Sequence, residues 1–180
     1  AATGRRLPGR PARRPVHGPR VRAGIFARPG AHPRHPGQPD EIQLPPGLKF
    51  DESLIRDFFS LLDKELCYTV EARDKSFIND EFFSILEENG VAWCIADSAG
   101  RYPYHETVTA SFVYIRLHGS QKLYASDYRD DELKAWKDKI LNWNRDAFVY
   151  FDNDFYGYAV KNARKLQQLF SGKNCNNHYD

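Results

Sequence analysis

Residues 91–97 read VAWCIAD, six apolar residues followed by an acid, and this stretch decides the class of fold. A short, continuous apolar run is typical of a strand that is buried on both faces of a parallel sheet. Asn89 and Gly90 stand directly before it, and glycine is the residue that most often ends a helix. Apolar residues at helical spacing over residues 82–86 lead up to that point. The segment therefore predicts one helix followed by one buried strand over residues 91–96.

The same alternation extends in both directions along the chain. Short apolar runs predict further strands over residues 66–71, 112–117 and 147–151. Helical spacing predicts helices after Asp51, which is a natural N-cap, from Asp130, and over residues 159–170. The connection over residues 98–111 lacks a helical pattern. This order predicts an α/β domain with a mainly parallel sheet.

Composition narrows the class of protein further. Of the 180 residues, 41% are apolar and 28% are charged, which suits one domain or a small domain with a tail. No apolar run approaches the ~18–20 residues that cross a bilayer, and no secretory signal is recognisable. Three cysteines without CxxC spacing exclude a disulfide framework and a cysteine zinc site, and Cys67 and Cys94 are expected to be buried in strands. We expect no membrane segment and a reducing, cytoplasmic location.

The first forty residues differ from the rest. They hold nine Arg, eight Pro, six Gly and six Ala but one acid, Asp40, whereas residues 41–180 carry six more acids than bases. Because so little apolar surface is present to offset the entropy of ordering, we expect residues 1–40 to be disordered. Such a segment is a solvated tail, the product of a GC-rich reading frame translated out of register, or a basic arm that binds nucleic acid. Since Phe26 alone is available for stacking on bases, the nucleic-acid interpretation is the weakest.

Polar side chains cluster where the predicted strands end. In parallel α/β folds the carboxyl ends of the strands line the ligand crevice, so polar residues directly after an apolar run indicate a shared site. All four predicted strands follow this pattern. The residues concerned are Glu71 and Arg73, then Asp97, then Arg116 and His118, and finally Asp152, Asn153 and Asp154.

Four motifs occur in the order found in one family: QLPP at residues 43–46, TVEAR at 69–73, YIRLHG at 114–119 and VYFDND at 149–154. Over residues 42–171 the chain resembles the YecE-like family, also called domain of unknown function 72. The resemblance implies a TIM barrel of which this chain holds strands four to eight, with residues 42–44 ending strand four. It implies no established activity. Residues 41–180 would then be a partial TIM-barrel domain, whose open edge favours a homodimer.

Each strand-end residue has a structural and a functional interpretation. Arg116 and His118 alternate on one strand and share a face, so Arg116 requires a carboxylate such as Glu71 or an anionic ligand. His118 is either a general base or a hydrogen-bonded structural residue. Asp154 is most simply the N-cap of the last helix.

Two classes of function remain open. The first, which we predict for this chain, is an orphan, incomplete barrel without activity of its own. The second is an acid–base or metal-assisted hydrolase of a phosphorylated or otherwise anionic small substrate. For that class we assign catalysis to His118, Glu71 and Asp152, and substrate binding to Arg116, Arg73, Gly119, Ser120, Asn153 and Tyr124. A divalent cation would be held by Glu71, Asp97, His118 and Asp152, but we assign no metal ligand and no cofactor.

Overall fold

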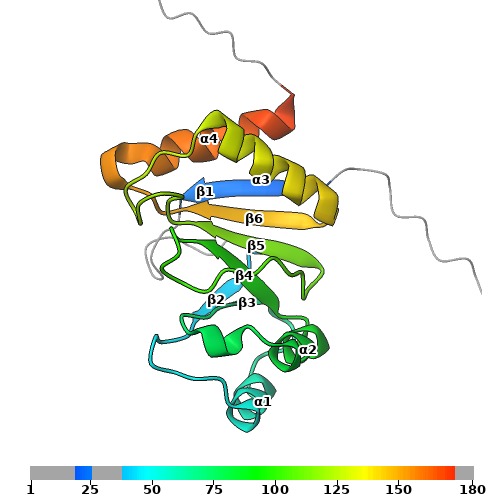
Figure 1. Cartoon of the computed structure of the whole chain (residues 1–180). Helices are drawn as coiled ribbons and strands as arrows, with labels where there is room; N and C mark the ends of the chain where they lie inside the picture. Colours follow the sequence, from blue (N-terminus) through cyan, green and yellow to red (C-terminus); the bar gives the residue numbers. More distant parts are fainter. Residues whose placement is uncertain (1–18, 26–37, 173–180) are drawn as a thin grey trace, which may run out of the picture.

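A computed structural model describes residues 19–25 and 38–172, in which six strands form one parallel sheet with helices packed against it (Figure 1). The strand order is β1-β6-β5-β4-β3-β2, and every neighbouring pair is parallel. The strands are β1 Val21–Ile25, β2 Asp40–Gln43, β3 Tyr68–Glu71, β4 Ala92–Asp97, β5 Phe112–Leu117 and β6 Asp146–Phe151. The helices are α1 Glu52–Ser60, α2 Asp80–Asn89, α3 Asp130–Trp143 and α4 Tyr158–Ser171, with short 3-10 turns at Lys75–Phe77 and Phe155–Gly157.

Local sequence signals set the helix ends. Asp51 caps α1 by accepting a hydrogen bond from the backbone N–H of Leu54, and Asn79 caps α2 in the same way through Phe82. Gly90 ends α2 in the left-handed conformation, with φ 64°. The predicted helix–strand alternation is confirmed, and β5 has the predicted bounds.

Strict alternation divides each central strand between two apolar clusters. Odd-numbered positions of β4 and β5, such as Trp93, Ile95 and Ile115, belong to the large cluster that the helices share. The even-numbered positions Cys94 and Tyr114 belong to a smaller cluster built from strand residues on the opposite face. The sheet is therefore covered by helices on one face and packs its own side chains together on the other.

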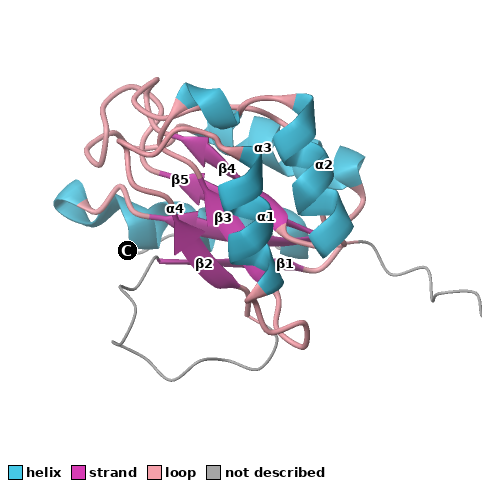
Figure 2. Ribbon diagram, turned by 90° about the horizontal axis from the view of Figure 1, so that it is seen from below, coloured by secondary structure: helices cyan, strands magenta, loops and turns pink. Residues whose placement is uncertain are grey.

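Helices α1 and α2 lie side by side (Figure 2). Helices α3 and α4 pack together at the other end of the sheet, beside β1 and β6 (Figure 1). The connection from β4 to β5 contains no helix, as the sequence predicted. Thr109 bonds this connection to the start of β4. Its hydroxyl oxygen accepts from the backbone N–H of Trp93 at 2.8 Å, and the hydroxyl donates to the carbonyl of Val91 at 2.7 Å. Residues 98–111 therefore take the place of a helix between α2 and α3.

The expectation of disorder over residues 1–40 is wrong for residues 21–25, which form β1. The backbone N–H of Ala147 donates to the carbonyl of Arg20 at 2.9 Å, and the Gln167 side chain donates to the carbonyl of Ala23. A composition averaged over forty residues hides this short strand, because its partners lie at the far end of the chain. Residues 1–18 and 26–37, for which disorder was also expected, lie outside the described part of the chain.

Two smaller predictions are also wrong. Asp154 does not cap α4, because a 3-10 turn intervenes and Gly157 occupies the N-cap position. Cys67 is exposed since β3 begins one residue later than it, whereas Cys94 is buried as predicted. No helix in the described part of the chain combines the length and apolar character that crossing a bilayer demands.

Replacing Thr109 by valine tests how the helix-free connection is held. The variant keeps the side-chain volume but leaves the backbone groups of Val91 and Trp93 without their partner, so we expect a loss of about 2–3 kcal/mol in the free energy of unfolding. Urea unfolding followed by circular dichroism measures it. Thr107→Val is the matched control, since Thr107 is only half-buried, and an equal effect of the two changes would contradict the assignment.

Candidate functional site

Glu71, the last residue of β3, is fully buried and holds four polar side chains at the carboxyl ends of the strands. Its Oε1 lies 3.0 Å from Nε2 of His118. Its Oε2 accepts from Arg116 Nη1 at 2.6 Å, Gln43 Nε2 at 2.8 Å and Arg73 Nη2 at 3.0 Å. Since burial of an unpaired carboxylate is unfavourable, this set of donors is what permits a charge at this place. Burial raises the pKa of Glu71, but the His118 hydrogen bond and the charges of Arg116 and Arg73 outweigh it and hold the pKa well below its ordinary value.

Arg116 is surrounded by carboxylates. Besides Glu71, its Nη1 donates to Glu41 Oε1 at 2.8 Å and its Nη2 to Asp152 Oδ2 at 2.7 Å. Glu41 lies on β2 and Arg116 on β5, which are three strand spacings or about 14 Å apart along a flat sheet. The two side chains can meet only because the sheet curls toward this face. The predicted pairing with Glu71 is confirmed, and it makes Arg116 a residue that positions carboxylates.

His118 follows β5 and lies between two acids. Its Nδ1 is 2.7 Å from Asp152 Oδ2, and its Nε2 faces Glu71. Burial by itself lowers the pKa of His118, but the hydrogen bonds and charges of Asp152 and Glu71 outweigh it, so the pKa lies above the ordinary 6.5. A ring with a carboxylate at each nitrogen is stabilised as the imidazolium. These surroundings favour the protonated ring, which is a proton donor, whereas the sequence offered His118 as a general base.

The family model described as "Protein of unknown function DUF72" matches residues 38–178. The chain belongs to the DUF72 family. The predicted resemblance is thereby confirmed, and the family description names no activity.

Solved structures of DUF72 proteins share the fold. One from Thermotoga maritima has a TM-score of 0.65 at 21% identity, with 73% of this chain and 56% of that chain covered. One from Enterococcus faecalis has a TM-score of 0.62 at 20% identity, with 79% of this chain and 60% of that chain covered. The chain thus spans less than two thirds of the length of these relatives. The comparison with curated proteins gave no match.

Two tyrosines, Tyr102 and Tyr124, pack against Arg73 and His118 at the candidate site of this DUF72 protein. The guanidinium carbon of Arg73 lies 3.6 Å from the ring centroid of Tyr102, a cation–π contact. The Tyr124 ring is 5.6 Å from the His118 ring, and its hydroxyl is 3.3 Å from that of Tyr102. Tyr124 has φ 60°, a conformation that is rare for a tyrosine. The predicted place of Tyr124 beside the strand ends agrees with this arrangement.

Several buried polar atoms at this site have no hydrogen-bond partner in the described part of the chain. They are Arg73 Nε, Ser120 Oγ, Asp152 Oδ1 and Asn153 Oδ1. Such atoms are rare in folded proteins, because an unmade buried hydrogen bond costs about 1–3 kcal/mol. Arg73 and Ser120 offer donors, whereas Asp152 offers an acceptor. The site therefore has both kinds of group available for a ligand.

Two of the predicted binding residues have other tasks. The backbone N–H of Gly119 donates to the Tyr128 hydroxyl at 3.0 Å, so it is not available to an anion. Gly119 has φ 121°, and a Cβ there would lie 2.4 Å from the carbonyl oxygen of Lys122, which explains the glycine. The Asn153 amide donates to the carbonyl of Ser126 and to Asn162 Oδ1, holding the β6 end against α4.

Asp97 is separated from the acids around Arg116. Its Oδ2 accepts from the Tyr128 hydroxyl at 3.0 Å, on the side of the strand ends that faces α3. No group of three or more His, Cys, Asp or Glu in the described residues is placed to hold a metal ion. The centre of the acid cluster is occupied by the Arg116 guanidinium, so the four ligands considered from the sequence do not converge.

Sequence reasoning missed Glu41 and Tyr102. Glu41 stands two residues before Gln43, so alternation along β2 places both side chains on the face of Arg116. This alternation could have identified Glu41 from the sequence. No sequence pattern could have identified Tyr102, because it lies in the irregular connection between β4 and β5. Burial raises the pKa of Glu41 to about 7, with the charge of Glu71 adding to the effect and Arg116 opposing it.

Replacing Glu41 by glutamine tests this pKa. The folded chain holds the Glu41 proton up to a pH of about 7, whereas the ordinary value is 4.5. Ionisation of Glu41 therefore destabilises the fold as the pH rises through that window. Glu41→Gln lacks this ionisation, so its stability relative to the wild type should rise by about 2 kcal/mol between pH 5 and pH 8. Urea unfolding across that pH range measures the difference, with the exposed Glu87→Gln as the control. A constant difference between the variant and the wild type would refute the raised pKa.

Proposed function

We propose that the sheet is an incomplete TIM barrel, open between β1 and β2. Consecutive strands from β2 to β6 are neighbours, as they are in a barrel. β1 instead pairs with β6, the last strand, which is the contact that closes a barrel on itself. Only residues 26–39 separate Ile25 from Asp40, whereas one βαβ unit takes roughly 30 residues. The cyclic order is that of an eight-stranded barrel without its second and third strands.

We further infer that the carboxyl ends of these strands bind a small phosphorylated or otherwise anionic ligand and supply acid–base groups to it. The observation that carries this proposal is His118, held between Glu71 and Asp152, with Asp152 Oδ1 left without a partner. An imidazolium beside an available carboxylate oxygen is an acid and a base within reach of one ligand. A hydrogen phosphate group matches both, since it has acceptor oxygens and one hydroxyl donor.

The remaining groups fit the same ligand. Arg73 Nε and Ser120 Oγ can donate to phosphate oxygens. The half-exposed ring of Tyr124 covers the centre, where it limits access of water. Glu41 and Arg116 hold the acids in place without touching the ligand. In a completed site, a ligand that replaces Asp152 at His118 Nδ1 would receive the ring proton on its leaving oxygen, and Asp152 would take the proton of the attacking water, which is the chemistry of acid–base hydrolysis.

The opening of the barrel limits this chemistry. The second and third strands would add side chains to the same mouth, because active sites of TIM barrels draw on the ends of several strands. We propose that the chain by itself binds the anion but does not turn over a substrate. The strands β1 and β2 at the two edges are where a second copy of the chain would pair.

Inorganic phosphate is the probe for the proposed site. Titrating it into the ¹⁵N-labelled full chain at pH 6.5 should shift the ring resonances of His118 saturably, with a dissociation constant in the millimolar range. His118→Gln removes the cation and should weaken binding, read from backbone amides near Ser120, at least tenfold. His105→Gln is the matched control, because that ring stacks on Phe83 away from the site.

Two results would contradict the proposal. The absence of a saturable shift, or equal affinity in wild type and His118→Gln, would exclude anion binding by this centre. Hydrolysis of nitrophenyl phosphate by the chain alone, lost in His118→Gln, would refute the claim that the site is catalytically incomplete.

A further inference from the structure

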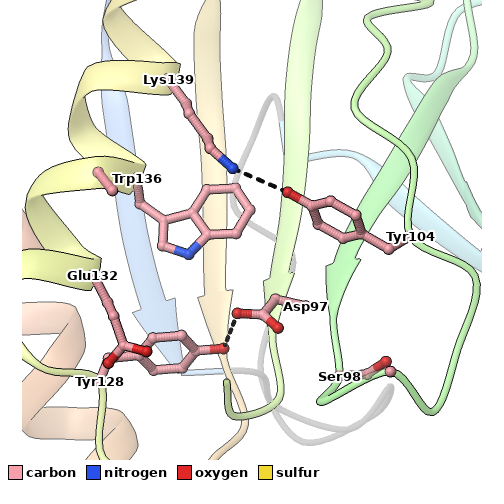
Figure 3. A pocket seen from close by; sticks show the side chains of 9 residues that line it. Asp97, Ser98, Tyr104, Tyr128, Glu132, Trp136 and Lys139 are labelled. Carbon is pink, nitrogen blue, oxygen red and sulfur yellow. Dashed lines mark hydrogen bonds between the residues drawn. The ribbon is translucent and has the colours of Figure 1, made fainter. Parts of the chain in front are cut away.

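A separate cleft of about 280 Å³ lies between α3 and the helix-free connection from β4 to β5 (Figure 3). It is present because residues 98–111 run past the sheet without a helix to fill this space. Tyr128 and Trp136 are its buried aromatic walls, and the half-exposed Tyr104 faces them from the connection. The site described above does not use this cleft.

One end of the cleft is acidic. The carboxylates of Asp97 and Glu132 both line it. Burial raises the pKa of Asp97, and the nearby charge of Glu132 raises it further. Asp97 makes no salt bridge with a lysine or arginine in the described residues, and Arg129 lies 3.9 Å from the Glu132 carboxylate. Two neighbouring carboxylates against aromatic walls attract a cation.

The lysine at the other end is already engaged. Lys139 donates to the Tyr104 hydroxyl at 3.1 Å and forms a salt bridge with Glu106, and its ammonium lies 4.8 Å from the Trp136 ring centroid. Its position over an aromatic ring is the geometry that a bound cation would adopt at the acidic end.

Trp136 supplies an independent indication of a ligand. The residue is 6% exposed, its indole nitrogen donates to no described residue, and this nitrogen is not among the fully buried atoms that lack a partner, so it opens into the cleft. In Figure 3 this nitrogen points toward the end of the cleft where Asp97 and Glu132 lie. A buried indole N–H normally has an acceptor. The Trp136 N–H is thus a donor directed into the cleft, available to an acceptor on the molecule that fills it.

We propose that this cleft binds a small amino alcohol, amino sugars included. The protonated amine would lie between Asp97 and Glu132, the carbon skeleton against Tyr104 and Tyr128, and a hydroxyl oxygen would accept from the Trp136 indole N–H. The cleft is large enough for a single sugar ring, and polar groups at one end with aromatic walls along the sides are typical of small-molecule sites.

Glucosamine and glucose form the test pair, because they share a ring and differ in one ammonium group. With the ¹⁵N-labelled full chain at pH 6.5, glucosamine should shift the indole N–H signal of Trp136, identified with Trp136→Phe, in a saturable way. Glucose should bind at least tenfold more weakly. Glu132→Gln keeps the side-chain oxygen that accepts from the Arg129 backbone N–H but removes the charge, and should weaken glucosamine binding at least fivefold.

Asp138→Asn, an exposed position on the same helix, is the charge-matched control and should bind as the wild type does. Asp97→Asn is a second variant, since its amide oxygen can still accept from Tyr128, and the backbone spectrum shows directly whether it stays folded. Equal shifts with glucose and glucosamine would overturn the assignment of a cation, and unchanged affinity in both Glu132→Gln and Asp97→Asn would do the same. No saturable shift up to 50 mM glucosamine, roughly the weakest affinity a built site would show, would overturn the site itself.

Discussion

The ion pair between Glu71 and Arg116 is the interaction on which the ends of the strands depend. Both side chains are buried, and removal of one partner from such a pair generally costs about 3–5 kcal/mol because a charge is left uncompensated. Arg116 also forms ion pairs with Glu41 of β2 and with Asp152, which directly follows β6, so the three acids meet at one point. This network ties four strands together across the concave face and sets the curl of the sheet.

The same network defines what is left for a ligand. Arg116 is engaged by three carboxylates and holds them in place, so His118 and the nearby atoms that lack partners are the groups we propose for ligand binding. The two acids on either side of His118 raise the pKa of its ring and so favour the protonated form. A site that retains unpaired buried atoms after so many hydrogen bonds have formed is unusual for a purely structural cluster.

The helix-free connection between β4 and β5 determines the shape of the surface beside α3. Crossovers between parallel strands usually contain a helix, which fills the space outside the sheet. Residues 98–111 make this crossover with Thr109 bonded to the backbone of β4 instead, and the space remains open beside α3. Trp136 on α3 belongs to the core, and part of its ring also lines this cleft.

The sequence by itself determined the helices and the central strands, because apolar spacing and capping residues such as Asp51 and Gly90 act over a few neighbouring positions. It also placed Glu71, Arg116, His118 and Asp152 at strand ends, since alternation and strand length are local. Only the tertiary structure decided that Glu41 joins them, that Gly119 and Asn153 face other partners, and that residues 21–25 form a strand beside β6. Those outcomes depend on contacts between residues up to 144 positions apart, and no local pattern encodes which distant strand or side chain completes a hydrogen bond.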